Sequence, residues 1–153
     1  RIVETVVDVN KKRKQQMAER VVQACGGTVD GKKICVLGVT FKPNTDDMRD
    51  SPSIDIIAGL QKYGGFIQAY DPEGMEEANQ MMVDVNWCDS AYEAIEGADV
   101  LVIITEWNEF RGLDMKRVKS LMNTPILVDL RNIYNPVDMA ETGIAYSCIG
   151  RSL

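Results

Sequence analysis

Two cationic side chains, Lys42 and Arg49, lie in a long polar loop that follows the apolar segment 33–39. Lysine supplies a compact positive charge and arginine a planar fork of N–H donors, so both side chains suit phosphate groups. Cations in a loop are also explained by solvation alone. The residue types therefore leave open both a phosphate site and an ordinary solvated loop.

Histidine is absent from the 153-residue sequence. The chain therefore cannot form a Ser-His-Asp or Cys-His catalytic unit, a histidine metal site, or an ordinary switch near about pH 6.5. The cysteines are far apart and include no Cys-x-x-Cys pair, which predicts buried structural thiols in a reducing compartment: Cys25, Cys35, Cys88 and Cys148. Solvation and helix capping explain the acidic residues of the loop, so no metal site is predicted: Asp46, Asp47 and Asp50.

The overall composition is that of a single globular domain, with 45% hydrophobic and 26% charged residues. A net charge of −6 argues against nucleic acid as a partner. The apolar run 100–104 is far shorter than the roughly 18 residues of a membrane span. We recognise no secretory h-region at the start of the given sequence and therefore expect no export. We expect a cytoplasmic protein without nucleic-acid or membrane partners.

Short apolar segments alternate with helical segments from residue 33 onward. Strands are predicted at 33–39, 66–70, 83–87, 100–104, 125–129 and 144–149. Helices are predicted from Ser51-Pro52, near 75–82, from an Asp89 cap, and near 115–122. This alternation predicts βαβ units and a parallel sheet covered on both faces, which is a doubly wound, Rossmann-like α/β fold.

The first segment is a helix that does not belong to this alternation. Its apolar residues recur at helical spacing until Gly26-Gly27 ends it, and its basic run 11–14 is explained by a solvated face. No capping residue precedes Ile2, so we expect a helix cut in mid-course and a fragment of a longer protein. An apolar stripe on this helix is expected to drive self-association: Val3, Val6, Val7, Met17 and Val21.

In open α/β sheets, ligands bind beyond the carboxyl ends of the strands. The loop after the first strand would carry Gly-x-Gly-x-x-Gly in a dinucleotide-binding domain, but residues 38–43 read GVTFKP and keep one glycine. Asp71 ends the next strand, where such a domain would place its ribose carboxylate. Cations in place of backbone amides indicate a different phosphate arrangement.

The stretch 38–53, GVTFKPNTDDMRDSPS, closely resembles the C-terminal-domain motif of the UDP-glucose/GDP-mannose dehydrogenase family. Three further segments resemble the same family: 70–72 (YDP), 105–110 (TEWNEF) and 129–132 (DLRN). The opening helix, with Val9-Asn10 before its basic run, resembles the end of the long helix that links the two halves of these proteins. The resemblance covers essentially the whole chain.

The resemblance implies an NAD-dependent oxidation of UDP-glucose to UDP-glucuronate, which converts the C6 alcohol to a carboxylate. In the family, an N-terminal domain holds NAD, and a cysteine in Gly-Gly-x-Cys forms the covalent intermediates. Here Gly26-Gly27 instead follows Cys25. The expected function is that of the C-terminal UDP-sugar-binding domain, inactive alone. Residues 1–27 would end the linking and dimerisation helix of a homodimer, and residues 28–153 would bind the nucleotide sugar.

The resemblance also assigns individual residues. Phe41 and Lys42 match positions that contact the substrate, and Arg131 matches a further substrate contact. Arg49 matches the position that reaches the NAD held by the other domain, although it could instead pair with an aspartate of its own loop. No catalytic residue is expected in this chain. Trp107 could stack on uracil or ribose together with Phe41, but an aromatic residue at a strand end is more often part of the core.

Three alternatives remain open at this point. Related enzymes that oxidise UDP-N-acetylmannosamine or GDP-mannose share this half. A flavodoxin-like sensing module would want acidic residues after the first strand and a lysine after the fifth, where this chain has Lys42 and Arg131. The third alternative is a non-catalytic structural domain whose role is dimerisation through the first helix.

Overall fold

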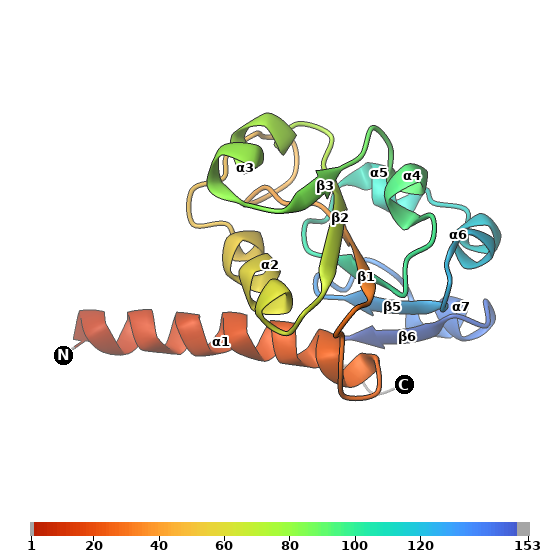
Figure 1. Ribbon diagram of the computed structural model, residues 1–153, viewed down its shortest axis with the longest axis horizontal. Coiled ribbons are helices and arrows are strands. Elements are labelled where there is room, and N and C mark those ends of the chain that lie inside the picture. Colours follow the sequence, from red (N-terminus) through yellow and green to blue (C-terminus); the bar gives the residue numbers. More distant parts are fainter. Residues whose placement is uncertain (1, 150–153) are drawn as a thin grey trace.

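The predicted alternation forms one six-stranded sheet in the computed structural model, which describes the backbone of residues 2–149 and the side chains of residues 12–149 (Figure 1). The strands are β1 (Lys33–Leu37), β2 (Phe66–Tyr70), β3 (Val85–Trp87), β4 (Val100–Ile103), β5 (Ile126–Asp129) and β6 (Ala145–Cys148). The helices are α1 (Ile2–Ala24), α2 (Pro52–Lys62), α3 (Met75–Met81), α4 (Ala91–Ile95), α5 (Asn108–Arg111), α6 (Met115–Leu121) and α7 (Pro136–Ala140).

The strands are all parallel and lie in the order β3-β2-β1-β4-β5-β6. This is the Rossmann order, so the doubly wound α/β prediction is confirmed. The strand order reverses between β1 and β4, which places the ligand-binding crevice of such folds beyond the ends of these two strands. A flavodoxin-like sheet has the order 2-1-3-4-5, so the fold does not support the sensing-module alternative.

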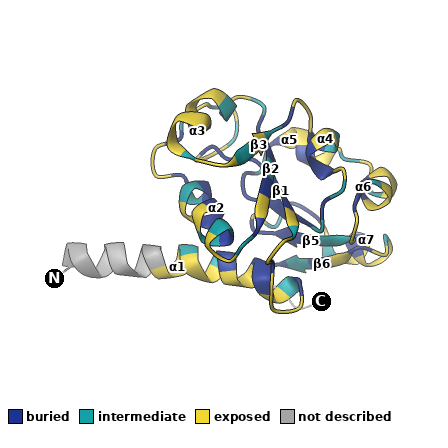
Figure 2. Cartoon of the chain, viewed as in Figure 1, coloured by how far each residue is buried: buried dark blue, intermediate teal, exposed yellow. Residues whose placement is uncertain are grey.

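Alternate residues of each strand enter two separate cores, one on each face of the sheet. From β1, Cys35 and Leu37 pack on the face that carries α4 and α6, whereas Ile34 and Val36 pack on the face that carries α1 and α2. All four residues of β4 are buried, as expected for a central parallel strand. Figure 2 shows this buried centre beneath exposed outer helix surfaces.

Helix α1 packs along α2 and beneath β5, and its N-terminal part extends beyond the body of the domain (Figure 1). Val21 is fully buried, while Lys12 and Arg13 are exposed, as predicted for a solvated basic face. Lys14 forms an ion pair with Asp55 of α2 at 3.1 Å. Of the predicted association stripe, the side chains at positions 3, 6 and 7 lie outside the described residues. Val21 is corrected, because it is buried in the core of this domain and is not available for self-association.

Two details of the predicted elements are corrected. Ser90, not Asp89, caps α4, because its hydroxyl oxygen accepts a hydrogen bond from the Glu93 amide at 3.1 Å. The short helices α5 and α7 were not predicted. The α7 start carries a readable signal, since Asn135 caps it and Pro136 holds its first position.

The four cysteines are free and buried, which confirms them as structural thiols. Burial raises the pKa of the Cys35 thiol well above its ordinary value. Among the described residues, no helix combines the length and apolar character needed to cross a membrane. The same residues contain no group of three cysteine, aspartate or glutamate side chains that could hold a metal ion.

Candidate functional site

The turn after β1 lies directly against the turn after β4. Gly38 has a φ of +87°, and a Cβ atom added there would lie 2.6 Å from the Cβ of Thr105 and 2.8 Å from its backbone nitrogen. The Thr105 hydroxyl donates a hydrogen bond to the Thr40 carbonyl at 2.7 Å. A glycine at position 38 therefore lets the two loops meet at the point where the strand order reverses.

Asp71, which follows β2, connects a third loop to the turn after β1. Its side chain is fully buried, and its Oδ2 accepts hydrogen bonds from the amides of Val39 at 2.8 Å and Thr40 at 3.2 Å. Its Oδ1 accepts from the amides of Glu73 and Gly74 at 2.9 and 2.8 Å. Asp71 follows β2 as predicted, but its carboxylate faces the protein's own loops and is not exposed to a ribose.

The long loop 38–51 is also fixed at its far end. Ser51 caps α2, as predicted, with Pro52 at the first helical position. The hydroxyls of Ser51 and Ser53 donate to the Val39 carbonyl at 2.6 and 2.5 Å. The N-terminus of α2 thus lies beside the residue that follows Gly38.

Phe41 and Lys42 occupy the exposed part of this loop. The Phe41 amide donates to the Asp47 carbonyl at 2.9 Å, which closes the loop, and the residue is 45% exposed. Lys42 is exposed, and its ammonium group has no hydrogen-bond or ion-pair partner in the part of the chain that is described. An exposed aromatic residue and an exposed cation without a direct partner among the described residues are therefore neighbours in sequence in this loop.

Arg49 instead has a partner. Its Nε and one terminal nitrogen donate to the two carboxylate oxygens of Asp47 at 3.0 and 3.1 Å, yet its side chain is 89% exposed. The hydrogen bond from Arg49 lowers the pKa of the Asp47 carboxyl, and the charge of Lys42 contributes to this lowering. The contact is the one expected if Arg49 holds its own loop, and the guanidinium is otherwise exposed to solvent.

Arg131 connects the loop after β5 to the loop after β4. Its Nε and one terminal nitrogen both lie 2.5 Å from the Oε2 of Glu106. Its backbone amide donates at 3.1 Å to Asp129, a fully buried carboxylate that also accepts from Ile133 at 2.8 Å and from the Tyr146 hydroxyl at 2.6 Å. Arg131 is therefore held against the loop after β4 by its side chain and against Asp129 by its backbone amide.

Phe41 and Lys42 lie in the loop after β1 and Arg131 lies in the loop after β5. The Thr105 and Glu106 contacts join each of these loops to the loop after β4. Trp107 is buried, and its indole N–H donates to Asp71 at 3.2 Å, so it belongs to the core and offers no free stacking surface. Sequence reasoning missed the joining roles of Asp71 and Thr105. A polar residue at the end of a buried strand is the signal that could have identified them.

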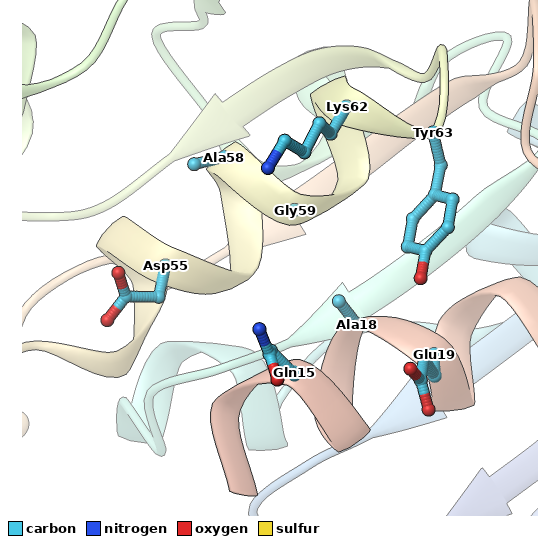
Figure 3. A pocket seen from close by; sticks show the side chains of 8 residues that line it. All are labelled: Gln15, Ala18, Glu19, Asp55, Ala58, Gly59, Lys62 and Tyr63. Atoms are coloured by element: carbon cyan, nitrogen blue, oxygen red, sulfur yellow. The ribbon is translucent and has the colours of Figure 1, made fainter. Parts of the chain in front are cut away.

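Two concavities lie elsewhere, along α1. One, of about 540 Å³, separates α1 from α2, and Figure 3 shows its lining side chains: Gln15, Ala18, Glu19, Asp55, Ala58, Gly59, Lys62 and Tyr63. A second, of about 450 Å³, is lined by Arg13, Gln16, Met17, Arg20 and Ile149. None of the four predicted site residues lines either of them.

Comparison with known proteins identifies the family. Residues 35–136 match the family model described as "UDP-glucose/GDP-mannose dehydrogenase family, UDP binding domain". UDP-glucose 6-dehydrogenase of Rhizobium meliloti (strain 1021) is 55% identical over 151 residues, which cover 99% of this chain and 35% of that protein. UDP-glucose 6-dehydrogenase TuaD of Bacillus subtilis (strain 168) is 35% identical, over 99% of this chain and 33% of that protein.

Solved structures agree with this match. A UDP-glucose dehydrogenase from the hyperthermophilic archaeon Pyrobaculum islandicum superposes with a TM-score of 0.71 at 26% identity, over 89% of this chain and 29% of that one. A UDP-D-ManNAc dehydrogenase from Pyrococcus horikoshii gives 0.70 at 26% identity, over 92% and 31%. This chain spans about a third of the length of the curated relatives described above. By its matched residues and its fold, the chain belongs to the UDP-glucose/GDP-mannose dehydrogenase family, as the UDP binding domain.

Proposed function

We propose that this chain is the UDP-sugar-binding part of an NAD-dependent UDP-glucose 6-dehydrogenase, which oxidises the C6 alcohol of UDP-glucose to the carboxylate of UDP-glucuronate. The observation that carries the proposal is the Lys42 ammonium group, which has no hydrogen-bond or ion-pair partner among the described residues. It follows exposed Phe41 in the loop after β1, at the strand ends where such folds bind ligands. The name of the 55% identical relative favours UDP-glucose over UDP-N-acetylmannosamine or GDP-mannose.

Each of the three proposed substrate contacts has one role in binding. Lys42 neutralises the pyrophosphate of the UDP group, because its ammonium group, without a direct partner among the described residues, can approach a phosphate directly. Phe41 covers an apolar part of the nucleotide or sugar. Arg131, already aligned by Glu106, supplies a second cation for the substrate. The oxidation itself is assigned to residues outside this chain.

NAD does not fit the crevice of this chain. A dinucleotide needs free backbone amides in the first turn and at the following helix N-terminus. Here the amides of Val39 and Thr40 donate to Asp71, and Ser51 caps α2. We therefore assign NAD mainly to the rest of the protein, with Arg49 as the contact from this chain. Residues 1–27 are proposed as the end of the linking helix and as the homodimer contact.

A binding measurement on the 153-residue chain tests the proposed function. Calorimetry or ligand-detected NMR is expected to show weak but saturable binding of UDP, because only part of the site is present. Uridine, which lacks the pyrophosphate, is expected to bind more weakly, since the proposed charge contacts are absent. Equal responses to UDP and uridine, or no response to UDP, would refute the proposal.

Replacement of Arg49 separates its two proposed roles. If Arg49 faces the cofactor, Arg49→Ala leaves the UDP dissociation constant of this chain within about twofold, since exposed substitutions have small effects. In a protein with both domains, the same change weakens NAD binding, because alanine cannot replace the guanidinium fork. Calorimetric dissociation constants for UDP and for NAD, compared between Arg49→Ala and the parent, distinguish the two roles. Equal losses for UDP and NAD would show that Arg49 only holds the loop through Asp47.

A further inference from the structure

We propose that Asp71 is a built-in anion: its carboxylate occupies the amide groups of the β1 turn and thereby positions Phe41 and Lys42. Asp71 is a positioning residue, because it reaches the substrate contacts only through the backbone of Val39 and Thr40. The ligand-binding part of the test below rests on the proposed function, and the stability part does not.

The amides bound by Asp71 have the place in the fold at which a Rossmann domain presents N–H groups to an external anion. The Val39 and Thr40 amides, directly after Gly38, donate to one carboxylate oxygen at 2.8 and 3.2 Å. The nearby helix offers no replacement donor at its first position, since that residue is Pro52. The anion that completes this turn is therefore supplied by the chain itself.

The carboxylate is bound from several sides. Its Oδ1 accepts hydrogen bonds from the amides of Glu73 and Gly74. Its Oδ2, which accepts from the β1 turn, also accepts from the indole N–H of Trp107. Hydrogen bonds from five N–H groups thus surround a fully buried negative charge. Such donors stabilise a charged acceptor more strongly than a neutral one. The arrangement accommodates a carboxylate.

The packing around Asp71 fixes the β1 turn, which directly precedes Phe41 and Lys42. A Cβ atom at Gly74 would lie 2.4 Å from the Cγ2 of Thr40 and 3.3 Å from the Oδ1 of Asp71, so the β2 loop and the β1 turn are in close contact. Thr40 is followed directly by Phe41 and Lys42. Loss of the carboxylate leaves five N–H donors without an acceptor and frees the turn that carries both side chains.

Chemical rescue by formate tests the proposal, because formate is the carboxylate group without the rest of the side chain. Asp71→Ala is expected to weaken UDP binding by about tenfold or more, the effect of losing at least one charge-assisted hydrogen bond. Titration with formate should then restore most of the affinity and raise the thermal midpoint of the variant. Formate should change neither property in the parent chain.

Asp99→Ala is the matched control. Asp99 also accepts a backbone hydrogen bond, from the Lys33 amide at 2.9 Å. It directly precedes β4, so it lies at the amino-terminal ends of the strands, opposite to the loop after β1. We expect Asp99→Ala to lower the thermal midpoint without changing UDP affinity or responding to formate. Equal formate responses of the two variants, or no response of Asp71→Ala, would overturn the proposal.

A second variant covers the case in which Asp71→Ala does not fold. Asp71→Asn keeps the shape of the side chain and one acceptor oxygen, but its NH2 group must face amide donors. It is expected to fold, to bind UDP more weakly than the parent, and to ignore formate. UDP affinity equal to that of the parent would overturn the proposal. If the parent itself binds no UDP, the proposed function fails, and the formate effect on thermal stability alone decides the role of Asp71.

Discussion

Gly38→Ala is expected to lower the free energy of unfolding by about 2–5 kcal/mol, the sum of left-handed backbone strain and overpacking. The φ of +87° at Gly38 is unfavourable for alanine, and the new Cβ would meet the Cβ, nitrogen and oxygen of Thr105 at 2.6–2.9 Å. Two of these atoms are backbone, so no side-chain rotation relieves the contact. Urea unfolding followed by far-UV circular dichroism measures the change.

Gly31→Ala separates the two causes. Gly31 has a φ of +74°, but no atom lies within 4 Å of the added Cβ. This control should lose only the strain component, about 1–2 kcal/mol. The difference between the two variants then measures how closely the β1 and β4 loops meet. Equal losses would contradict the close contact between Gly38 and Thr105.

The sequence predicted the elements well, where local signals exist. The apolar run at 100–104 and the Ser51-Pro52 start both appear in the structure as expected. The helix α5 was missed because Trp107 at its cap forms no side-chain capping bond, so the usual signal is absent. The order of the strands in the sheet could not be predicted from the alternation of strands and helices, since Rossmann and flavodoxin-like folds share that alternation.

The candidate site was harder to predict, because its organisation depends on contacts between distant residues. Asp71 binds amides more than 30 positions away, and Arg131 meets Glu106 across 25 positions. By contrast, the pairing of Arg49 with Asp47 spans two positions, and the sequence indicates it as an alternative to a cofactor contact. Local chemistry was therefore predictable, whereas the role of a strand-end carboxylate required the fold.

These pairings distinguish the three site cations. Arg49 and Arg131 each have a carboxylate partner within the chain, at 3.0 and 2.5 Å. Either guanidinium must share its charge between that partner and a bound phosphate. The Lys42 ammonium has no such competitor among the described residues. On this basis Lys42 is expected to contribute most to binding of the pyrophosphate.

Lys42→Ala should accordingly weaken UDP binding by about 1.5–3 kcal/mol, the range for hydrogen bonds to charged groups, or roughly 10- to 150-fold. The change leaves the loop intact, because the internal contacts near this residue are made by its backbone carbonyl and by the Phe41 amide. Calorimetry at fixed ionic strength measures the loss, and circular dichroism confirms the fold.

Lys62→Ala provides the matched control, since Lys62 is an exposed lysine in the groove between α1 and α2, away from the β1 loop. It removes the same charge from the chain and should leave the UDP affinity unchanged. A general electrostatic effect would lower both affinities together, because long-range attraction depends on total charge. Binding of UDP by Lys42→Ala at the affinity of the parent would show that Lys42 is only a solvated loop charge. A loss confined to Lys42→Ala would instead place the pyrophosphate against this ammonium group.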